Sequence, residues 1–403
     1  MSEWITTTVG KLGKVVTGKT PSKNNPEDWG NEYLFITPSD YGNYNKSANH
    51  SIRGFSEEGY KRHKVRMIPK HSCLVTCIGS DMGKVVTNAE DAFCNQQINA
   101  LIPNTSIIDS DYAYYFFKDS ALILKTLGSD GTAVPILNKS DFEKIELSIP
   151  PLPEQKAIAS VLSSLDDKID LLHRQNKTLE AMAETLFRQW FIEEAKEDWE
   201  KVTLGDIVNI TSSKRIFYSE YVDEGIPFYR SKEIIELNKS GQTRSELFIS
   251  NERFDGIVAK FGAPVEGDIL LTSVGTLGVT YQVKASDRFY FKDGNLTWFK
   301  DFKHISSNII FCWLNSKNGK EQLDNISIGS TQAALTIQGL KSLELSLPSL
   351  NVIQKLDEQL VVIYQKVNAN QSQIQTLEKL RDTLLPKLMS GEVRVQYQTA
   401  EVA

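Results

Sequence analysis

The sequence predicts an α+β protein that consists of two tandem α/β modules and two long helices, which pair with each other as a coiled coil. Two observations lead to this prediction. Short motifs of the first half return in the second half at a nearly constant offset of about 195 residues, far longer than the period of a solenoid repeat. In addition, each half ends in a long stretch with the apolar spacing of a coiled-coil helix. The chain therefore contains a duplicated unit of one domain and one helix.

The duplication is visible at the start and at the end of each module. Trp4 near the start of the chain returns as Trp199. At the end of the first module, residues 145–150 read IELSIP, and residues 343–348 read LELSLP. Because the offset barely changes over half of the chain, the duplication covers the whole unit.

Each module is expected to contain mostly short strands. In the first module, β-rich runs bounded by Gly, Pro, Asn and Asp cover residues 34–37, 73–78 and 98–102. Their counterparts in the second module are residues 227–229, 269–274 and 295–299. The spacing of these runs is irregular and shows no clean βαβ alternation, which disfavours a parallel doubly wound sheet.

The first long helix is expected to follow the proline-rich residues 150–153. From there, core positions recur in alternating steps of three and four residues, which is the seam of a coiled coil. Each helix spans roughly 50 to 60 Å and needs a partner, and the other helix of the same chain is the nearest candidate. The spacing leaves parallel and antiparallel pairing open. The predicted interface residues are Leu162, Leu165, Ile169, Leu172, Asn176, Leu179 and Leu186 in the first helix, and Leu360, Ile363, Val367, Asn370, Ile374, Leu377 and Leu384 in the second.

Two of these interface positions are polar. Asn176 and Asn370 each lie near the middle of a helix. We favour the interpretation that they fix the register of the pair, over a partly hydrated position that only costs stability.

Composition bounds the function. With 403 residues, 40% hydrophobic and 24% charged, the chain has room for two or three globular domains. No apolar stretch approaches the length of a membrane span, so a cytoplasmic location is expected. The four cysteines lack zinc spacing and are too few for a disulfide scaffold.

Charge argues against a protein that binds every polyanion, because the net charge is −6. A local basic run nevertheless occurs around Lys61, Arg62, Lys64 and Arg66. It is either a DNA-binding face or a solvated lysine-rich loop, and charge alone does not decide between them.

Residues 13–20, GKVVTGKT, satisfy the P-loop pattern in full. A P-loop follows a buried strand and opens a helix whose amides hold phosphates. Here Pro21 and Pro26 follow without helical periodicity, and the equivalent stretch after Gly205 has neither glycine. Nucleotide binding therefore remains an alternative interpretation only.

Other motifs do not indicate chemistry. Residues 79–84 and 275–278 are glycine-containing turns after the repeated apolar strand, and they are either hairpin turns or loops whose backbone approaches phosphates. No nucleophile elbow, zinc-ligand helix or dinucleotide fingerprint is present, and the five histidines offer no ligand pair at helical spacing. The sequence therefore predicts no catalytic and no metal-binding residue.

Three segments carry a resemblance to a known family. They are residues 147–155 (LSIPPLPEQ), 187–191 (FRQWF) and 384–392 (LLPKLMSGE). Together with the two modules and heptad helices, they make the whole chain similar to the specificity (S) subunit of Type I restriction-modification enzymes. In the second module, the proline-rich segment departs from this pattern and reads PSLNVIQ at residues 348–354.

The resemblance implies two target recognition domains, each reading one half of a bipartite site in double-stranded DNA. The helices would form an intramolecular antiparallel coiled coil that sets the spacer. It further implies a non-catalytic subunit of a DNA adenine methyltransferase and restriction endonuclease complex, docked to two methyltransferase subunits and to nuclease-translocase subunits. S-adenosylmethionine, ATP and Mg would be held by those partners, and no cofactor by this chain. The implied domains are residues 1–150 and 196–348 for recognition, 151–195 and 349–392 for the helices, and 393–403 for a tail.

Reading DNA requires side chains that reach base edges from loops held by phosphate contacts. Arg230 is the best candidate for a bidentate guanine contact. The alternative interpretation is that a given candidate is a surface residue of a turn without contact to DNA. The predicted DNA-binding residues are Thr17, Lys19, Thr37, Ser39, Asp40, Lys61, Arg62, Lys64, Arg66, Ser80, Lys84 and Thr132 in the first module, and Lys214, Arg230, Lys232, Thr276, Ser330, Thr331 and Gln332 in the second.

Two further classes of function stay open at this point. One is an ATP-binding protein that uses residues 13–20, and the other is a coiled-coil adaptor without DNA contact.

Overall fold

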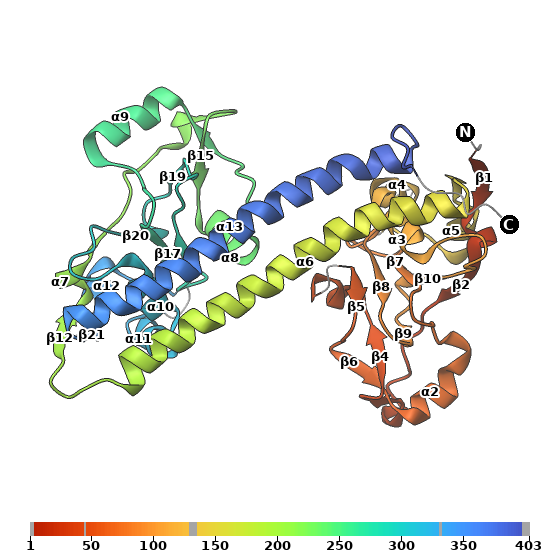
Figure 1. The fold of residues 1–403 in the computed structure, drawn as a ribbon, viewed down its shortest axis with the longest axis horizontal. Coiled ribbons are helices and arrows are strands. Elements are labelled where there is room, and N and C mark those ends of the chain that lie inside the picture. Colours follow the sequence, from red (N-terminus) through yellow and green to blue (C-terminus); the bar gives the residue numbers. More distant parts are fainter. Residues whose placement is uncertain (1–3, 44–45, 129–134, 330–332, 397–403) are drawn as a thin grey trace. The chain divides into compact units, whose positions relative to one another are not determined.

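The computed structural model describes residues 4–43, 46–128, 135–329 and 333–396 (Figure 1). The chain divides into two compact units, Met1–Leu171 with Ile374–Ala403, and Leu172–Gln373. We call them unit 1 and unit 2. Each unit contains one module and one stretch of each long helix, and the domain boundaries proposed from the sequence stay a prediction.

The main sheet of unit 1 has five strands. Apart from β5 and β8, which are parallel, neighbouring strands run antiparallel. A separate ribbon pairs the start of the module, β1 (Ile5–Thr8), with its end, β11 (Glu146–Ile149). The order in the main sheet is β2 (Gly13–Thr17), β10 (Ile98–Pro103), β7 (Cys73–Thr76), β8 (Val85–Asn88) and β5 (Ser47–Ala48).

A second, smaller sheet of unit 1 contains a parallel pair of strands. Its order is β3 (Trp29–Gly30), β6 (Arg53–Phe55), β4 (Tyr33–Ile36) and β9 (Ala92–Cys94), with β4 and β9 parallel. The helices of the module are α1 (Val9–Leu12), α2 (Glu57–His63), α3 (Ser110–Asp119), α4 (Ala121–Gly128) and α5 (Lys139–Lys144).

Unit 2 repeats this topology, except that its main sheet has no equivalent of β5 among the described residues. Its main sheet has the order β13 (Asn209–Thr211), β20 (Leu296–Lys300), β17 (Ile269–Thr272) and β18 (Thr280–Gln282). The small sheet contains β14 (Tyr221–Val222), β16 (Phe248–Ile249), β15 (Ile226–Tyr229) and β19 (Tyr290–Phe291), and β15 and β19 are again parallel. The ribbon pairs β12 (Glu200–Thr203) with β21 (Glu344–Leu347). The helices are α7 (Leu204–Ile207), α8 (Ser231–Ser240), α9 (Asn251–Phe261), α10 (Ser307–Asn315), α11 (Lys317–Asn325) and α12 (Ile337–Lys341). The predicted duplication and the mixed α/β character of the modules are confirmed.

The central strands form because both of their faces are covered. In β7, Cys73 and Val75 belong to one hydrophobic core cluster and Leu74 to another. In β17, Ile269 and Leu270 are divided between two clusters in the same way. Since successive side chains of a strand point to opposite faces, a strand buried on both faces reads as a continuous apolar run. This explains why these strands were visible in the sequence.

The two long helices are α6 (Leu152–Arg188, 37 residues) and α13 (Leu350–Met389, 40 residues). Their starts lie at equivalent positions, although the sequence before α13 departs from the proline-rich pattern before α6. At its end, α6 passes into a π-helical turn over Gln189–Glu193. Pro386 lies inside α13, in its last turn.

Within each unit, α6 and α13 run antiparallel. In unit 1, Asp166 of α6 pairs with Arg381 of α13, while Glu154, three turns earlier on α6, binds Arg394 beyond the end of α13. In unit 2, Asn176 of α6 contacts Asn370 of α13. The antiparallel coiled coil is therefore confirmed. Each predicted interface residue is buried or half-buried.

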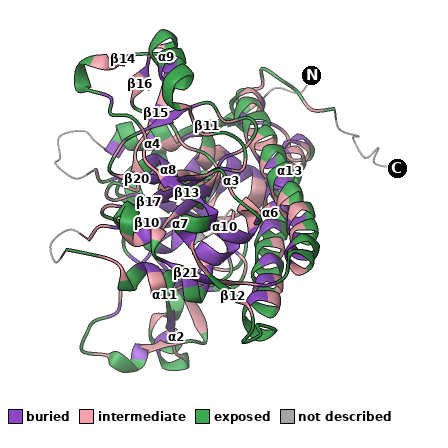
Figure 2. Cartoon of the chain, turned by 90° about the vertical axis from the view of Figure 1, so that its left-hand side faces the viewer, coloured by how far each residue is buried: buried purple, intermediate pink, exposed green. Residues whose placement is uncertain are grey.

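Burial follows the expected stripes. The long helices alternate buried and exposed positions, and α9 is largely exposed (Figure 2). All four cysteines are free and buried. In the described part of the chain, no helix combines the length and the apolar character needed to cross a membrane.

Candidate nucleic-acid interface

Several loops of unit 1 meet at one edge of its sheets. The parallel strands β4 and β9 end there together, and the main-chain N–H of Asn95 donates to the carbonyl of Ile36 at 3.3 Å. The end of β2 joins them, because the N–H of Lys19 donates to the carbonyl of Cys94 at 2.9 Å. The parallel ends of neighbouring strands thus bring loops from distant parts of the sequence into contact.

The hairpin between β7 and β8 lies beside the same loops. The N–H of Cys77 donates to the carbonyl of Gln97 at 2.7 Å, and the N–H of Gly79 donates to that of Pro135 at 3.0 Å. We call this edge the loop face of unit 1. It comprises residues 17–20, 37–40, 78–84 and 94–97.

Unit 2 has an equivalent loop face, made of residues 211–215, 230–232, 274–278 and 291–295. The N–H of Lys292, after β19, donates to the carbonyl of Tyr229 at the end of β15 at 2.8 Å. Lys214, after β13, donates its N–H to the Tyr290 hydroxyl at 2.7 Å. The N–H of Ser273, after β17, donates to the carbonyl of Asn295 at 2.8 Å.

The predicted DNA-binding residues on the loop face of unit 1 fall into two groups. Some side chains are exposed, and others form hydrogen bonds within the loops. Lys19, Ser39 and Ser80 are exposed, as is Lys84, whose ammonium lies 2.6 Å from Asp81. Asp40 is buried, 1% exposed, and its carboxylate accepts hydrogen bonds from the N–H and hydroxyl of Thr37 and from the N–H of Ile52. Asp40 and Thr37 therefore shape the loop, which differs from the direct DNA contact predicted for them.

Thr17 also has a structural partner, since its hydroxyl donates to Asn99 at 2.7 Å. Thr132 lies outside the described residues, as do Ser330, Thr331 and Gln332 of the second module.

In unit 2, the predicted cations are held by other side chains. The ammonium of Lys214 lies 4.5 Å from the centre of the Phe261 ring, and Thr276 is exposed. The guanidinium of Arg230 binds Glu233 at 2.6 Å and Glu246 at 2.8 Å, and Lys232 binds Glu246 at 2.6 Å. Arg230 would have to exchange Glu246 for a base to make the predicted guanine contact.

The charges around Arg230 affect one another. The hydrogen bonds that Arg230 donates to Glu233 and Glu246 raise the pKa of Arg230. The hydrogen bonds of Lys232 and Arg230 lower the pKa of Glu246 to about 2. Glu246 therefore stays ionised at neutral pH and offsets two of the cations at this loop face.

The basic run of unit 1 also separates into two groups. Arg62 binds Glu27 at 3.1 Å and Asp28 at 3.0 Å, and Arg66 donates to the main-chain oxygen of Thr17 at 2.8 Å. Arg62 therefore ties α2 to the helical turn Pro26–Asp28, and Arg66 ties the turn after α2 to Thr17 of the loop face. Lys61 and Lys64 are exposed; Lys61 pairs with Glu58 at 3.8 Å, and the ammonium of Lys64 lies 5.7 Å from the centre of the Tyr60 ring.

The P-loop interpretation does not fit the geometry. Gly13–Thr17 is strand β2, paired antiparallel with β10, and the next helical turn begins only at Pro26. Glycine is required at positions 13 and 18 for a steric reason. A Cβ atom on Gly13 would lie 2.0 Å from the oxygen of Ile102, and one on Gly18 would lie 2.1 Å from that of Asn95. Close backbone approach, not phosphate binding, accounts for the pattern.

The sequence reasoning missed one segment in each loop face. Residues 94–97 lie between the Lys19 loop and the hairpin of unit 1, and residues 291–295 take the same place in unit 2. A signal was present, because a short polar stretch directly precedes each of the repeated strands β10 and β20. Only the parallel pairing of β4 with β9 shows that this stretch is central.

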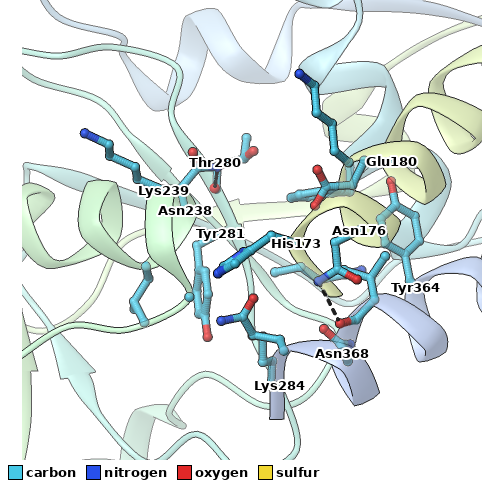
Figure 3. A pocket seen from close by; sticks show the side chains of 17 residues that line it. His173, Asn176, Glu180, Asn238, Lys239, Thr280, Tyr281, Lys284, Tyr364 and Asn368 are labelled. Carbon is cyan, nitrogen blue, oxygen red and sulfur yellow. Dashed lines mark hydrogen bonds between the residues drawn. The ribbon is translucent and has the colours of Figure 1, made fainter. Parts of the chain in front are cut away.

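A polar pocket of about 250 Å³ lies elsewhere in unit 2, between α6, α13, α8 and β18 (Figure 3). His173, Tyr281 and Lys284 line it, together with Asn176, which donates to the main-chain oxygen of Val367. The Tyr281 hydroxyl is engaged by Asp287 at 2.7 Å. No group of potential metal ligands occurs among the described residues.

Two similar modules, each with exposed cations on a face made of loops, are typical of a protein that binds a nucleic acid in two places. Comparison with known proteins agrees with this class. The model of the Type I restriction modification DNA specificity domain matches residues 1–181 and again residues 196–379. The chain belongs to this family and carries its domain twice.

Relatives match over nearly the full length. The Type I restriction enzyme MjaIX specificity subunit of Methanocaldococcus jannaschii is 28% identical, over 98% of this chain and 94% of that protein. The MjaVIII specificity subunit of the same organism is 25% identical over the same shares. The crystal structure of a Type I restriction-modification S subunit from M. genitalium, 19% identical, shares the fold with a TM-score of 0.62 over 96% of both chains. The chain therefore serves DNA sequence recognition in a Type I restriction-modification system, and the ATP-binding and adaptor alternatives are not supported.

Proposed function

We propose that each unit reads one half of a bipartite DNA site with its loop face. The observation that carries this proposal is that the same loop face occurs twice with different side chains. Lys19 and Lys214 take equivalent places, whereas the central segment reads Asn95-Gln96-Gln97 in unit 1 and Lys292-Asp293-Gly294-Asn295 in unit 2. Shared cations suit phosphates, which are alike in every sequence, and differing central residues suit different bases.

The proposal extends to the helices. Continuous helices of 37 and 40 residues link the two units and would set the spacer between half-sites. Changing their length should alter the spacer and leave the bases of each half unchanged.

The chain would act without catalysis of its own. Its two internally similar repeats suit two copies of one partner, and we assign these to methyltransferase subunits, with nuclease-translocase subunits completing the complex. S-adenosylmethionine, ATP and Mg²⁺ would be bound by those partners. A subunit that reads the chromosome would work in the cytoplasm.

Genome-wide mapping of methylated adenines, with and without this gene, tests the proposal. We expect one bipartite motif to lose its methylation when the gene is deleted. A chimera in which residues 1–150 are exchanged for another such module should change one half of that motif only. An unchanged motif in the chimera, or none that depends on the gene, would refute the proposal.

A further inference from the structure

The segment at the centre of the loop face in unit 1 is held rigidly on both sides of Gln96. On one side, the carbonyl of Cys94 accepts from Lys19 N–H at 2.9 Å, and Asn95 N–H donates to Ile36 at 3.3 Å. On the other side, the carbonyl of Gln97 accepts from Cys77 N–H at 2.7 Å. Three strands therefore fix the backbone from which Gln96 projects.

The two neighbouring amides are occupied with each other. The side-chain nitrogen of Asn95 donates to the side-chain oxygen of Gln97 at 2.8 Å, and the oxygen of Asn95 accepts from the N–H of Gln97 at 3.1 Å. Asn95 is 9% exposed. These two residues shape the turn, so neither amide is presented to a ligand in full.

Gln96 differs from both neighbours. It is exposed, and its amide oxygen accepts a hydrogen bond from the Thr20 hydroxyl at 2.8 Å. Among the described residues, none accepts a hydrogen bond from its amide nitrogen. The bond to Thr20 orients the amide and leaves the second lone pair of the oxygen and both N–H groups for a ligand.

An amide presents an acceptor and a donor side by side. In the major groove, adenine offers the complementary pair, the N6 amino group and N7, whereas guanine offers two acceptors, which suit arginine or lysine. Lys19, on the adjoining loop, supplies a cation for a neighbouring phosphate. A rigid backbone, an oriented amide and a nearby cation together suit direct reading of one base.

Unit 2 has different chemistry at the same place. The carboxylate of Asp293 accepts a hydrogen bond from Arg215 at 2.9 Å, and Lys292 is exposed. No second exposed glutamine occupies this segment, which reads Lys-Asp-Gly-Asn at residues 292–295. The exposed glutamine of unit 1 thus has no glutamine counterpart in this segment of unit 2.

Resting on the proposed function, we propose that Gln96 reads an adenine in the half-site of unit 1, and that Thr20 is its positioning residue. The ligand is the major-groove edge of an A·T pair. Lys19 would contact the backbone beside it and contribute affinity without base preference.

Selection from random duplexes tests this. The tagged full chain, purified with the subunits that accompany it, is presented with a random duplex library, and the bound DNA is sequenced. We expect Gln96→Ala to lose about 10- to 100-fold discrimination at one A·T position, because a bidentate base contact is worth that much. The affected position should lie in the half that changes in the residues 1–150 chimera.

Two further variants sharpen the test. Gln96→Glu, whose carboxylate only accepts, should shift the preference at that position toward a C·G pair, since the amino group of cytosine is a donor. Thr20→Val should weaken the same preference without moving it. Asn31→Ala, an exposed amide at the opposite end of β4, is the matched control and should leave the motif unchanged.

The outcomes separate the two proposals. If the wild-type complex selects no bipartite motif, the proposed function fails. If it does, but the Gln96 variants, shown by thermal unfolding to be folded, select the same motif or relax a G·C position, Gln96 does not read adenine.

Discussion

The side chain of Asn370 donates a hydrogen bond of 2.8 Å to the amide oxygen of Asn176, across the antiparallel helices α13 and α6. Asn176 donates in turn to the main-chain oxygen of Val367 at 3.3 Å. Both asparagines are buried, with 7% and 1% of their surface exposed for Asn176 and Asn370. A shift of either helix by one turn would set each amide against apolar side chains. This contact supports the predicted role of the pair in setting the register.

Replacing one asparagine should cost more than replacing both. We expect Asn370→Leu to lower the free energy of unfolding by about 1–3 kcal/mol, because it leaves the buried oxygen of Asn176 without its donor. The double variant N176L/N370L should be close to the wild type or more stable, since it removes both polar groups. Urea unfolding of the three proteins measures this. If the single and double variants lose the same unfolding free energy, the unpaired amide of Asn176 does not explain the loss in the single variant.

The stability of unit 1 should be sensitive to the ion pair at the buried carboxylate of Asp166. It is 7% exposed and accepts hydrogen bonds from Arg381 at 2.9 Å and from the Tyr115 hydroxyl at 2.8 Å, with Lys118 as a more distant cation at 3.5 Å. We expect Arg381→Met to cost about 2–4 kcal/mol of unfolding free energy, because it leaves a buried carboxylate without its closest cation.

Lys61→Met is the matched control for Arg381→Met. Lys61 also pairs with a carboxylate, that of Glu58 at 3.8 Å, but both side chains are more than half exposed, 68% and 53%. Its loss should be below about 1 kcal/mol. If both variants unfold at the same urea concentration, burial of Asp166 does not raise the cost of losing its cation partner.

Glu246 should restrain DNA binding by unit 2. It holds both Arg230 and Lys232, so Glu246→Gln should release two cations toward the DNA backbone. We expect a higher affinity for DNA. The slope of log affinity against log salt concentration should become steeper by up to about two, because up to two more counterions are released on binding. Titration of the complex with its DNA at several salt concentrations checks this. Glu252→Gln, an exposed carboxylate on α9, is the control and should leave the slope unchanged.

The same glutamate predicts an acid dependence of stability. The pKa of Glu246 is lowered from 4.5 to about 2, and the hydrogen bond that it accepts from Lys232 is the largest cause. Because the folded-state pKa lies below the ordinary value, its contribution is complete above pH 4.5 and is lost as the pH falls toward 2. Wild type should therefore melt slightly above Glu246→Gln at pH 6, and the difference should shrink between pH 4.5 and 3. A difference that stays constant over this range would contradict the assignment.

Lys19 and Lys214 should contribute affinity without base preference. Each lysine that neutralises a phosphate releases about one counterion on binding. Lys19→Ala and Lys214→Ala should therefore each reduce the slope of log affinity against log salt concentration by about one. The motif itself should stay the same. Lys11→Ala is the matched control, because Lys11 is exposed but lies before β2, at the end of that strand away from Lys19. An equal effect of all three would indicate a general loss of charge.

Some of this architecture follows from the amino-acid sequence alone. The duplication, the two heptad helices and strands such as β7 and β17 are readable because each depends on side chains close together in sequence. The polar positions Asn176 and Asn370 stand out for the same reason, since they interrupt an otherwise apolar seam.

Tertiary structure decided which loops act together and which charges are free. The sequence contains Arg230 and Glu246 but cannot show that they pair, because their separation along the chain says nothing of their distance in space. The central place of Gln96 likewise depends on the parallel pairing of β4 with β9, which are far apart in sequence. Contacts of this kind are set by long-range packing, and for that reason only the folded chain reveals them.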